Sequence, residues 1–103
     1  MTNSKRINRQ ILEKDFLNNI VKLARLSGWL VYHTYDSRRS EKGYPDITMT
    51  RHGRIIFAEV KREGEAPTVE QTIWLKTLAE NENIEVYLWY PSEWENVESI
   101  LKG

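Results

Sequence analysis

Two acidic residues and a lysine lie on the two sides of a short turn, at Asp46, Glu59 and Lys61. If His52 and Gly53 form a two-residue hairpin loop, Asp46 lies opposite Glu59, and the Cβ atoms of such partners are about 4.5–5.5 Å apart. Carboxylates this close repel each other, and a bound divalent cation would relieve the repulsion. Because side chains alternate along a strand, Lys61 shares the face of Glu59. The alternative is an ordinary salt bridge between Lys61 and one acid at the sheet surface.

The available ligand types favour a hard metal ion. The chain has no Cys, so a thiolate zinc site and a Cys nucleophile are both excluded. Carboxylate oxygens favour Mg²⁺, with Mn²⁺ as a substitute, over zinc. Mg²⁺ usually takes only one or two protein carboxylates and completes its shell with water and with phosphate oxygens of a substrate.

A third acid, Glu13, lies in a helix that the periodicity of apolar residues predicts from about Arg9 to Ser27. At 100° per residue, one arc of this helix is polar and contains Lys14, Asp15, Asn18, Asn19, Lys22 and Arg25. Glu13 lies in the opposite, apolar arc, where a carboxylate needs a cation, a hydrogen bond or a proton. Alternatively, Glu13 reaches water near the start of the helix or interacts favourably with the helix dipole.

Turn and capping residues divide the chain into seven elements. The predicted elements are a helix over 9–27, strands over 29–35, 47–50 and 55–61, a helix that follows Thr68, a strand over 84–90 and a short closing helix. Gly28 would take the left-handed conformation that ends the first helix. Thr68 with Gln71, and Ser92 with Glu95, match the capping box that begins a helix. The order αβββαβα predicts an α/β fold.

Length and composition indicate one small domain over residues 1–103, with a single core shared with any site. We expect a cytoplasmic protein without a membrane association, because no apolar run approaches the ~20 residues that cross a bilayer. The formal net charge of zero conceals a division: residues 1–62 hold 13 Lys/Arg and six Asp/Glu, whereas residues 63–103 hold two Lys and nine Glu. The first half could therefore form a basic surface for a polyanion, or both sets could simply be solvated.

Several of these residues fall into a known pattern. The segment Gly43-Tyr44-Pro45-Asp46, followed after a hairpin by Glu59-Val60-Lys61 and in the next helix by Gln71, resembles the PD-(D/E)XK nuclease superfamily. Phe57-Ala58 before Glu59, Gln71-x-x-Trp74-Leu75, and the helix ending at Gly28-Trp29 resemble stand-alone phage-type VRR-NUC domains over nearly the whole chain. The resemblance implies a restriction-endonuclease-like core, with a mixed four-stranded sheet flanked by helices.

The resemblance also implies a metal-dependent hydrolase of DNA phosphodiester bonds. Asp46, Glu59 and the backbone carbonyl of Val60 would bind Mg²⁺ or Mn²⁺, and Lys61 would orient or activate the attacking water. Glu13 would match the first-helix acid of the family and help to hold the metal or a water molecule. Gln71 would match the motif glutamine near the active site, although the capping box with Thr68 explains a glutamine there equally well.

His33, Arg38, Arg39 and Lys42 resemble a segment that contacts DNA phosphates, although two arginines in a polar loop are also ordinary surface. The implied activity is a structure-selective endonuclease, above all a Holliday junction resolvase, in a bacterial or phage-infected cell. Two symmetric cuts by a chain with one candidate site require a homodimer. The alternatives are a flap or nicking repair nuclease without junction preference, a non-catalytic DNA-binding module of the same fold, and a small protein-interaction domain.

Overall fold

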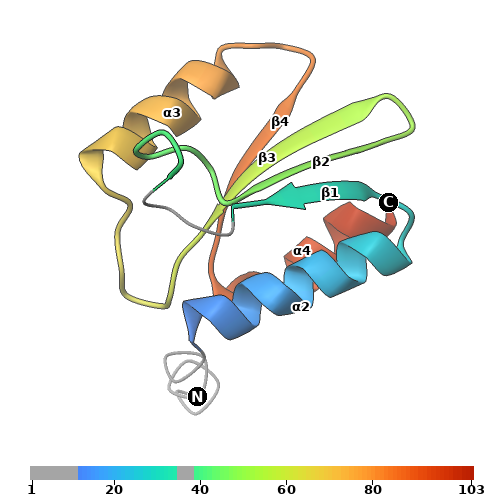
Figure 1. The fold of residues 1–103 in the computed structure, drawn as a ribbon. Helices are drawn as coiled ribbons and strands as arrows, with labels where there is room; N and C mark the ends of the chain where they lie inside the picture. Colours follow the sequence, from blue (N-terminus) through green and yellow to red (C-terminus); the bar gives the residue numbers. More distant parts are fainter. Residues whose placement is uncertain (1–11, 35–38) are drawn as a thin grey trace.

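The computed structural model describes residues 12–34 and 39–103, which form a four-stranded sheet with helices on both sides (Figure 1). The helices are α2 (Glu13–Leu26), α3 (Val69–Ala79) and α4 (Trp94–Lys102), and a 3-10 turn, η1 (Pro91–Glu93), precedes α4. The strands are β1 (Leu30–His33), β2 (Ile47–Arg51), β3 (Arg54–Val60) and β4 (Glu85–Trp89). These elements confirm the predicted α/β class and the order αβββαβα.

The sheet is mixed, and its strands follow the order β1-β2-β3-β4. The pairs β1–β2 and β2–β3 are antiparallel, whereas β4 joins β3 in parallel after the chain crosses over through α3. The β2–β3 hairpin has the predicted register, with Arg51 opposite Arg54. The two-residue loop requires positive φ angles, and His52 at 50° and Gly53 at 79° supply them. The turn chemistry therefore determines which side chains face each other along the hairpin.

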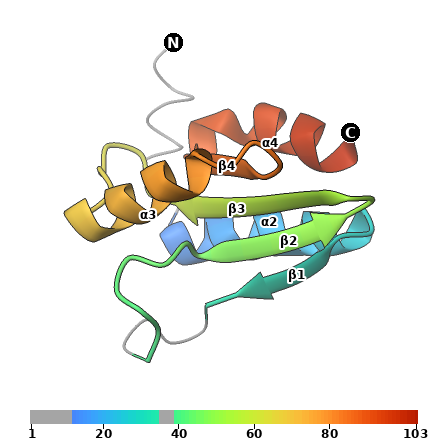
Figure 2. The same cartoon turned by 90° about the horizontal axis from the view of Figure 1, so that it is seen from above.

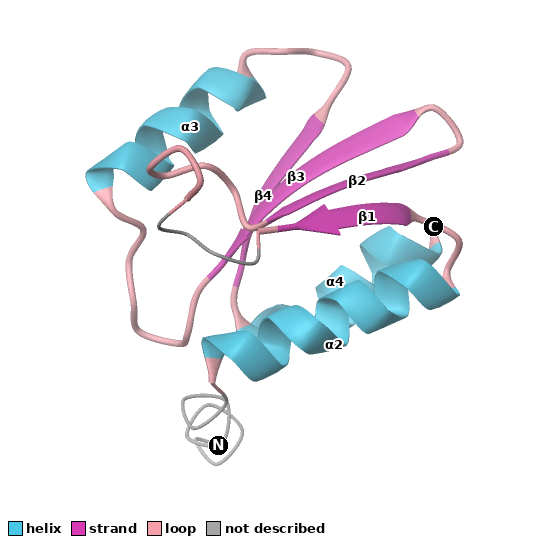
Figure 3. Ribbon diagram, viewed as in Figure 1, coloured by secondary structure: helices cyan, strands magenta, loops and turns pink. Residues whose placement is uncertain are grey.

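The helices α2 and α4 pack against one face of the sheet, and α3 lies on the other face next to β4 (Figures 2 and 3). The core between the sheet, α2 and α4 contains Phe16, Ile20, Ala24, Ile47, Met49, Ile56, Ala58, Val60, Trp89, Val97 and Leu101. Because Ala58 and Val60 point into this core, Glu59 between them points to the opposite face of the sheet. None of the helices in the described ranges combines the length and apolar character needed to span a bilayer.

The first helix differs from its predicted bounds. It begins at Glu13, because the backbone of Leu12 is extended (ψ 146°), and residues 9–11 lie outside the described part of the chain. Gly28 has the predicted left-handed conformation, with φ at 91°. The backbone N–H of Trp29 donates to the carbonyl of Ala24 (3.0 Å), so Trp29 completes the helix end and β1 begins one residue later than predicted. The bounds of the other three strands agree with the prediction to within one residue.

The capping box predicted for Ser92 and Glu95 is wrong. The backbone N–H of Ser92 donates to Glu63 Oε1 (2.7 Å), and Glu93 Oε1 accepts from the backbone N–H of Tyr90 (3.0 Å). Pro91 fixes its φ angle and begins a 3-10 turn, which delays the start of α4 to Trp94. The capping box of Thr68 and Gln71 at the start of α3 is confirmed.

Candidate active site

Asp46 and Glu59 lie side by side at the end of the hairpin farthest from its turn. Asp46 directly precedes β2, Glu59 is the penultimate residue of β3, and their side chains are close enough to form a hydrogen bond. The backbone N–H of Val60 donates to Asp46 Oδ2 (3.0 Å), and the backbone N–H of Thr34 donates to the carbonyl of Asp46 (3.0 Å). Backbone groups on both neighbouring strands therefore hold Asp46 in place. The predicted proximity of the two acids is confirmed.

Glu59 is the buried member of this pair. Its side chain is 1% exposed, and its Oε1 atom has no hydrogen-bond partner among the described residues. The pKa of Glu59 is raised to about 9, mainly by burial and in addition by the negative charge of Asp46 and the hydrogen bond with Asp46. A carboxyl group in this environment is stable with a proton or next to a cation. The burial of Glu59 is a feature that the strand pattern alone did not reveal.

Glu13 and Lys61 complete the group of charges. Burial and the negative charge of Asp46 raise the pKa of Glu13, and the positive charge of Lys61 lowers the pKa of both Glu13 and Glu59. The backbone N–H of Lys61 donates to the carbonyl of Trp89 (3.0 Å), which extends the pairing of β3 with β4 by one residue. In the described part of the chain, no ion pair within 4.0 Å involves Lys61. The alternative of an ordinary salt bridge at this position is therefore wrong.

The carboxylate pair fits a divalent cation. Glu59 Oε1 is a buried oxygen without a partner, and Asp46 supplies a second carboxylate beside it. Both are hard ligands of the type that Mg²⁺ and Mn²⁺ prefer, and a cation would remove the repulsion that raises the pKa of Glu59. Within residues 12–34 and 39–103, no three Asp, Glu or His side chains form a ready-made metal site. The described residues therefore fit a metal that two carboxylates hold. Glu13 adds a negative charge nearby, which also raises the pKa of Glu59.

Gln71 is used by its own helix. Its Oε1 atom accepts from the backbone N–H of Thr68 (2.8 Å), and its backbone N–H donates to Thr68 Oγ1 (3.1 Å). No hydrogen bond among the described residues joins Gln71 to Glu13, Asp46, Glu59 or Lys61. The capping interpretation of Gln71 is confirmed, and its place in the active site stays a prediction.

The segment that leads into Asp46 is held against α3 by Gly43, Tyr44 and Trp74, to which the sequence assigned no role in the site. Gly43 has φ at 87°, and a Cβ atom at this position would lie 2.6 Å from the backbone of Glu70. The indole N–H of Trp74 donates to the carbonyl of Lys42 (3.2 Å), and the ring of Tyr44 packs edge-on against Trp74 at 5.0 Å between centroids. Gly43 and Trp74 both belong to the motifs of the family resemblance. Their place in these motifs is the sequence feature that could have indicated a role near the site.

The candidate DNA contacts have different surroundings. Lys42 is exposed, and its Nζ atom lies 3.8 Å from Glu70 Oε2. Arg39 is exposed, whereas His33 is half-buried at the end of β1, opposite Ile47. Arg38 lies outside the described residues. The structure therefore places Lys42 and Arg39 at the surface, and the grouping of the four residues into one DNA contact stays a prediction.

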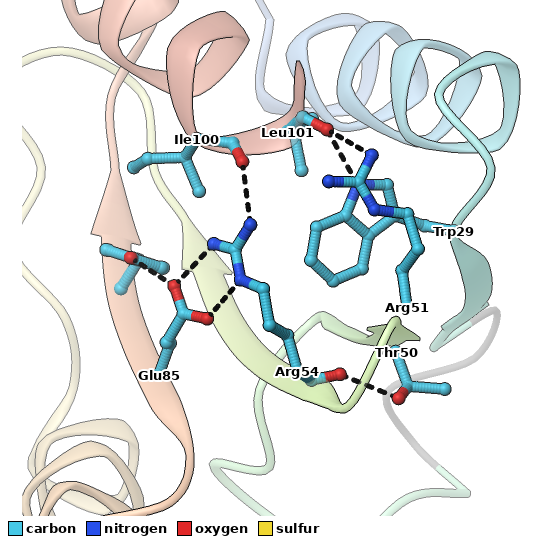
Figure 4. A network of polar contacts seen from close by, with 8 residues as sticks. Trp29, Thr50, Arg51, Arg54, Glu85, Ile100 and Leu101 are labelled. Carbon is cyan, nitrogen blue, oxygen red and sulfur yellow. Dashed lines mark hydrogen bonds and ion pairs between the residues drawn. The ribbon is translucent and has the colours of Figure 1, made fainter. Parts of the chain in front are cut away.

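The turn end of the hairpin holds a second charged cluster, shown in Figure 4. Arg54 donates from Nε and Nη2 to the two carboxylate oxygens of Glu85 (2.7 and 2.8 Å), and the hydroxyl of Tyr87 donates to Glu85 Oε1 (2.7 Å). Arg54 also lies over the ring of Trp29, 5.0 Å from its centroid. The hydrogen bonds from Arg54 lower the pKa of Glu85. The indole N–H of Trp29 donates to the carbonyl of Leu101 (2.8 Å), which ties this cluster to the end of α4.

Comparisons of the chain with protein-family models, with curated proteins and with solved structures give no match. The resemblance to VRR-NUC domains consequently stays a prediction.

Proposed function

We propose that this protein is a metal-dependent endonuclease of the PD-(D/E)XK type that hydrolyses phosphodiester bonds in DNA. The observation that carries the proposal is the carboxylate pair of Asp46 and Glu59, in which a buried oxygen of Glu59 has no hydrogen-bond partner. Burying one carboxylate beside another destabilises a protein unless a cation compensates it. A role in metal binding and catalysis therefore explains the carboxylate pair next to Lys61 better than a role in stabilising the fold.

In this proposal each residue has a distinct task. Asp46 and Glu59 would hold the metal, together with the backbone carbonyl of Val60, and the backbone N–H of Val60 holds Asp46 in place (3.0 Å). Bound Mg²⁺ supplies Lewis acidity and lowers the pKa of water. Lys61 places a positive charge where negative charge develops on the phosphate, and it orients the attacking water. Glu13, whose pKa is raised, accepts a hydrogen bond from that water.

We further propose that the substrate is branched DNA, above all a four-way junction, and that the protein acts as a cytoplasmic homodimer. The edge strand β1 supports a dimer, because Leu30 is 76% and Tyr32 59% exposed and both line a groove of about 440 Å³. The strand contains neither a charged residue nor a proline that would block pairing with a second copy. A two-fold pairing of β1 with its counterpart would join the two sheets and continue the apolar face that contains Leu30 and Tyr32 from one copy to the other.

The dimer has its own test. Leu30→Lys is expected to halve the mass measured by light scattering and to replace paired cuts with single nicks, whereas Val69→Lys, at an exposed apolar position on α3, should leave the mass unchanged. A Leu30→Lys protein that remains dimeric contradicts the role of this edge.

The nuclease proposal is tested with an end-labelled immobile four-way junction and the matching linear duplex, each incubated in Mg²⁺ and in EDTA. Paired symmetric nicks in the junction alone, and only with Mg²⁺, are expected. Metal-dependent cutting of both substrates would indicate a flap or nicking nuclease without junction preference and would contradict the assignment as a resolvase. Binding without cutting in Mg²⁺ or Mn²⁺ would leave a non-catalytic DNA-binding module of the same fold.

A further inference from the structure

Three cations on the solvent-facing side of α2 have no acidic partner among the described residues. Lys14, Lys22 and Arg25 are exposed, and none of them forms an ion pair within 4.0 Å with any acid that the structure describes. Several other described cations form ion pairs, as in Lys42–Glu70, Arg54–Glu85, Arg62–Glu65 and Lys102–Glu98. Lys76 is also exposed without an ion pair in the described ranges, but it is the only Lys or Arg of α3. Cationic side chains that repel one another and form no ion pair with the described acids are suited to an external anion.

The helix geometry arranges these cations as a line. At 100° per residue, Lys14, Asn18, Lys22 and Arg25 fall within about 80° of one another, and the line extends about 16 Å along the axis at 1.5 Å per residue. Asn18 is exposed and adds an amide donor between the cations. The acid nearest this line on the same helix is Asp15, at its edge. We call these four residues the α2 stripe.

The position of the stripe connects it to the acids. Lys14 directly follows Glu13, and α2 runs from there toward the turn end of the hairpin (Figure 1), where Arg51 Nη1 donates to the carbonyl of Ser27 (2.8 Å). Phe16, Ile20 and Ala24 of α2 are buried in the core, so the stripe lies on the opposite, exposed side of the helix. Duplex DNA presents one phosphate per 3.4 Å of each strand, so a stripe of about 16 Å spans several phosphates. The charge and the length both match a sugar-phosphate backbone better than a single small anion.

We propose that the α2 stripe binds the backbone of a double-stranded DNA arm that leads away from the cleavage site. This inference rests on the proposed function for its ligand, and it adds contact residues other than the predicted His33, Arg38, Arg39 and Lys42. Backbone contacts position the duplex without reading its bases, so the stripe contributes affinity and orientation and no sequence preference.

The test measures DNA binding in EDTA, where no cleavage occurs. The full-length protein and a Lys14→Gln, Lys22→Gln, Arg25→Gln variant are titrated against a fluorescein-labelled duplex and a labelled four-way junction at several salt concentrations. Each lost phosphate contact reduces the slope of log K against log salt by about 0.9. We expect the variant to lose about 2–3 from the slope and at least about tenfold in affinity at 100 mM salt.

Two matched variants make the result specific. Lys76→Gln with Lys102→Gln removes two exposed cations from α3 and α4 and should leave the slope unchanged, because both lie outside the stripe. Lys14→Arg, Lys22→Arg, Arg25→Lys retains the charges and should restore binding. The proposal is overturned if the stripe variant keeps the slope of the unmodified protein, or if that protein does not bind duplex DNA at 50 mM salt.

Failure of this inference and failure of the nuclease proposal are distinguishable. A protein that cuts DNA in Mg²⁺ but whose salt dependence does not change in the stripe variant remains a nuclease without this surface. If the stripe variant loses salt-dependent binding but the unmodified protein never cuts DNA, the binding surface is supported and the nuclease proposal is contradicted.

Discussion

The two ends of β3 carry charged clusters that differ in how their charges are compensated. At the turn end, Arg54 and Glu85 form two hydrogen bonds, and the pKa of Glu85 is lowered. At the other end, about 17 Å away along the strand, Glu59 is buried beside Asp46 and its pKa is raised to about 9. The first cluster stabilises the fold by itself. The second is destabilising without a cation, and for that reason it is the better candidate for function.

The contrast predicts opposite effects of pH. The pKa of Glu85 is lowered in the folded protein, so its contribution to stability is present above the ordinary pKa of 4.5 and is lost as the pH falls through the lowered value. The pKa of Glu59 is raised, so above pH 4.5 the unfolded chain loses a proton that the folded chain retains up to about pH 9. The metal-free protein is therefore destabilised by Glu59 as the pH rises over that interval.

The largest expected effect is that of Asp46→Asn. The substitution keeps the shape of the side chain but removes one negative charge from the proposed metal site, so junction cleavage in Mg²⁺ should fall by at least about 10³-fold. Binding to the uncleaved junction should be retained or become stronger, because one charge that repels DNA phosphates is lost. Loss of the folded structure, measured by circular dichroism, would instead make Asp46 a structural residue.

Lys61→Ala should reduce kcat by about 10²–10³-fold with only a modest loss of DNA binding, since an interaction made mainly in the transition state is removed. Cleavage of the junction under single-turnover conditions measures this effect. Lys76→Ala on α3 is the matched control and should leave turnover unchanged. An unaltered kcat in Lys61→Ala would remove Lys61 from the mechanism.

At the turn end, Glu85→Gln should lower the free energy of unfolding by about 1–2 kcal/mol, because Arg54 loses a charged partner at a half-buried position. The midpoint of urea unfolding at pH 7 measures the loss. Nuclease turnover should remain within about twofold, because the pair lies far from the acids. A loss of activity without a loss of stability would contradict the division of β3 into a structural and a functional end.

Glu59→Gln should have a smaller effect, and in the opposite direction. Without metal at pH 8, the unmodified chain must take up a proton at Glu59 when it folds, and the neutral amide removes this cost, so the free energy of unfolding should rise by about 1 kcal/mol. Its decline between pH 5 and 9 should also become shallower than in the unmodified protein. Glu82→Gln, at an exposed acid, is the control for the general loss of one charge. Equal pH dependence in all three proteins would show that Glu59 is not the source of the decline.

The parts of the fold that depend on local chemistry could be predicted from the sequence. Gly53 and His52 determine the hairpin loop, and the loop determines that Asp46 faces Glu59, because register propagates from the turn. The start of α4 could not be predicted in this way. Ser92 matched the local pattern of a cap, but its backbone N–H bonds to Glu63, 29 residues earlier in the chain.

The features that depend on tertiary packing could not be predicted from the sequence either. Strand alternation placed Glu59 on one face of the sheet but could not indicate that the face is covered there and that the side chain is only 1% exposed. The pairing of Arg54 with Glu85 depends on the parallel crossover through α3, which joins residues 31 positions apart. The close approach of Gly43 to Glu70 likewise depends on how α3 packs against the loop before Asp46.

The central claim is that Asp46 and Glu59 together bind a divalent cation, and the most direct test is thermal unfolding of the protein with increasing Mg²⁺ or Mn²⁺ in the absence of DNA. We predict that the Tm of the unmodified protein rises with metal concentration, as expected for a ligand that binds only the folded state. Under the same conditions, the Tm of Glu59→Gln and of Asp46→Asn should show no such rise, while Glu85→Gln should respond like the unmodified protein. A metal-dependent rise of equal size in Glu59→Gln, or none in the unmodified protein, would contradict the account.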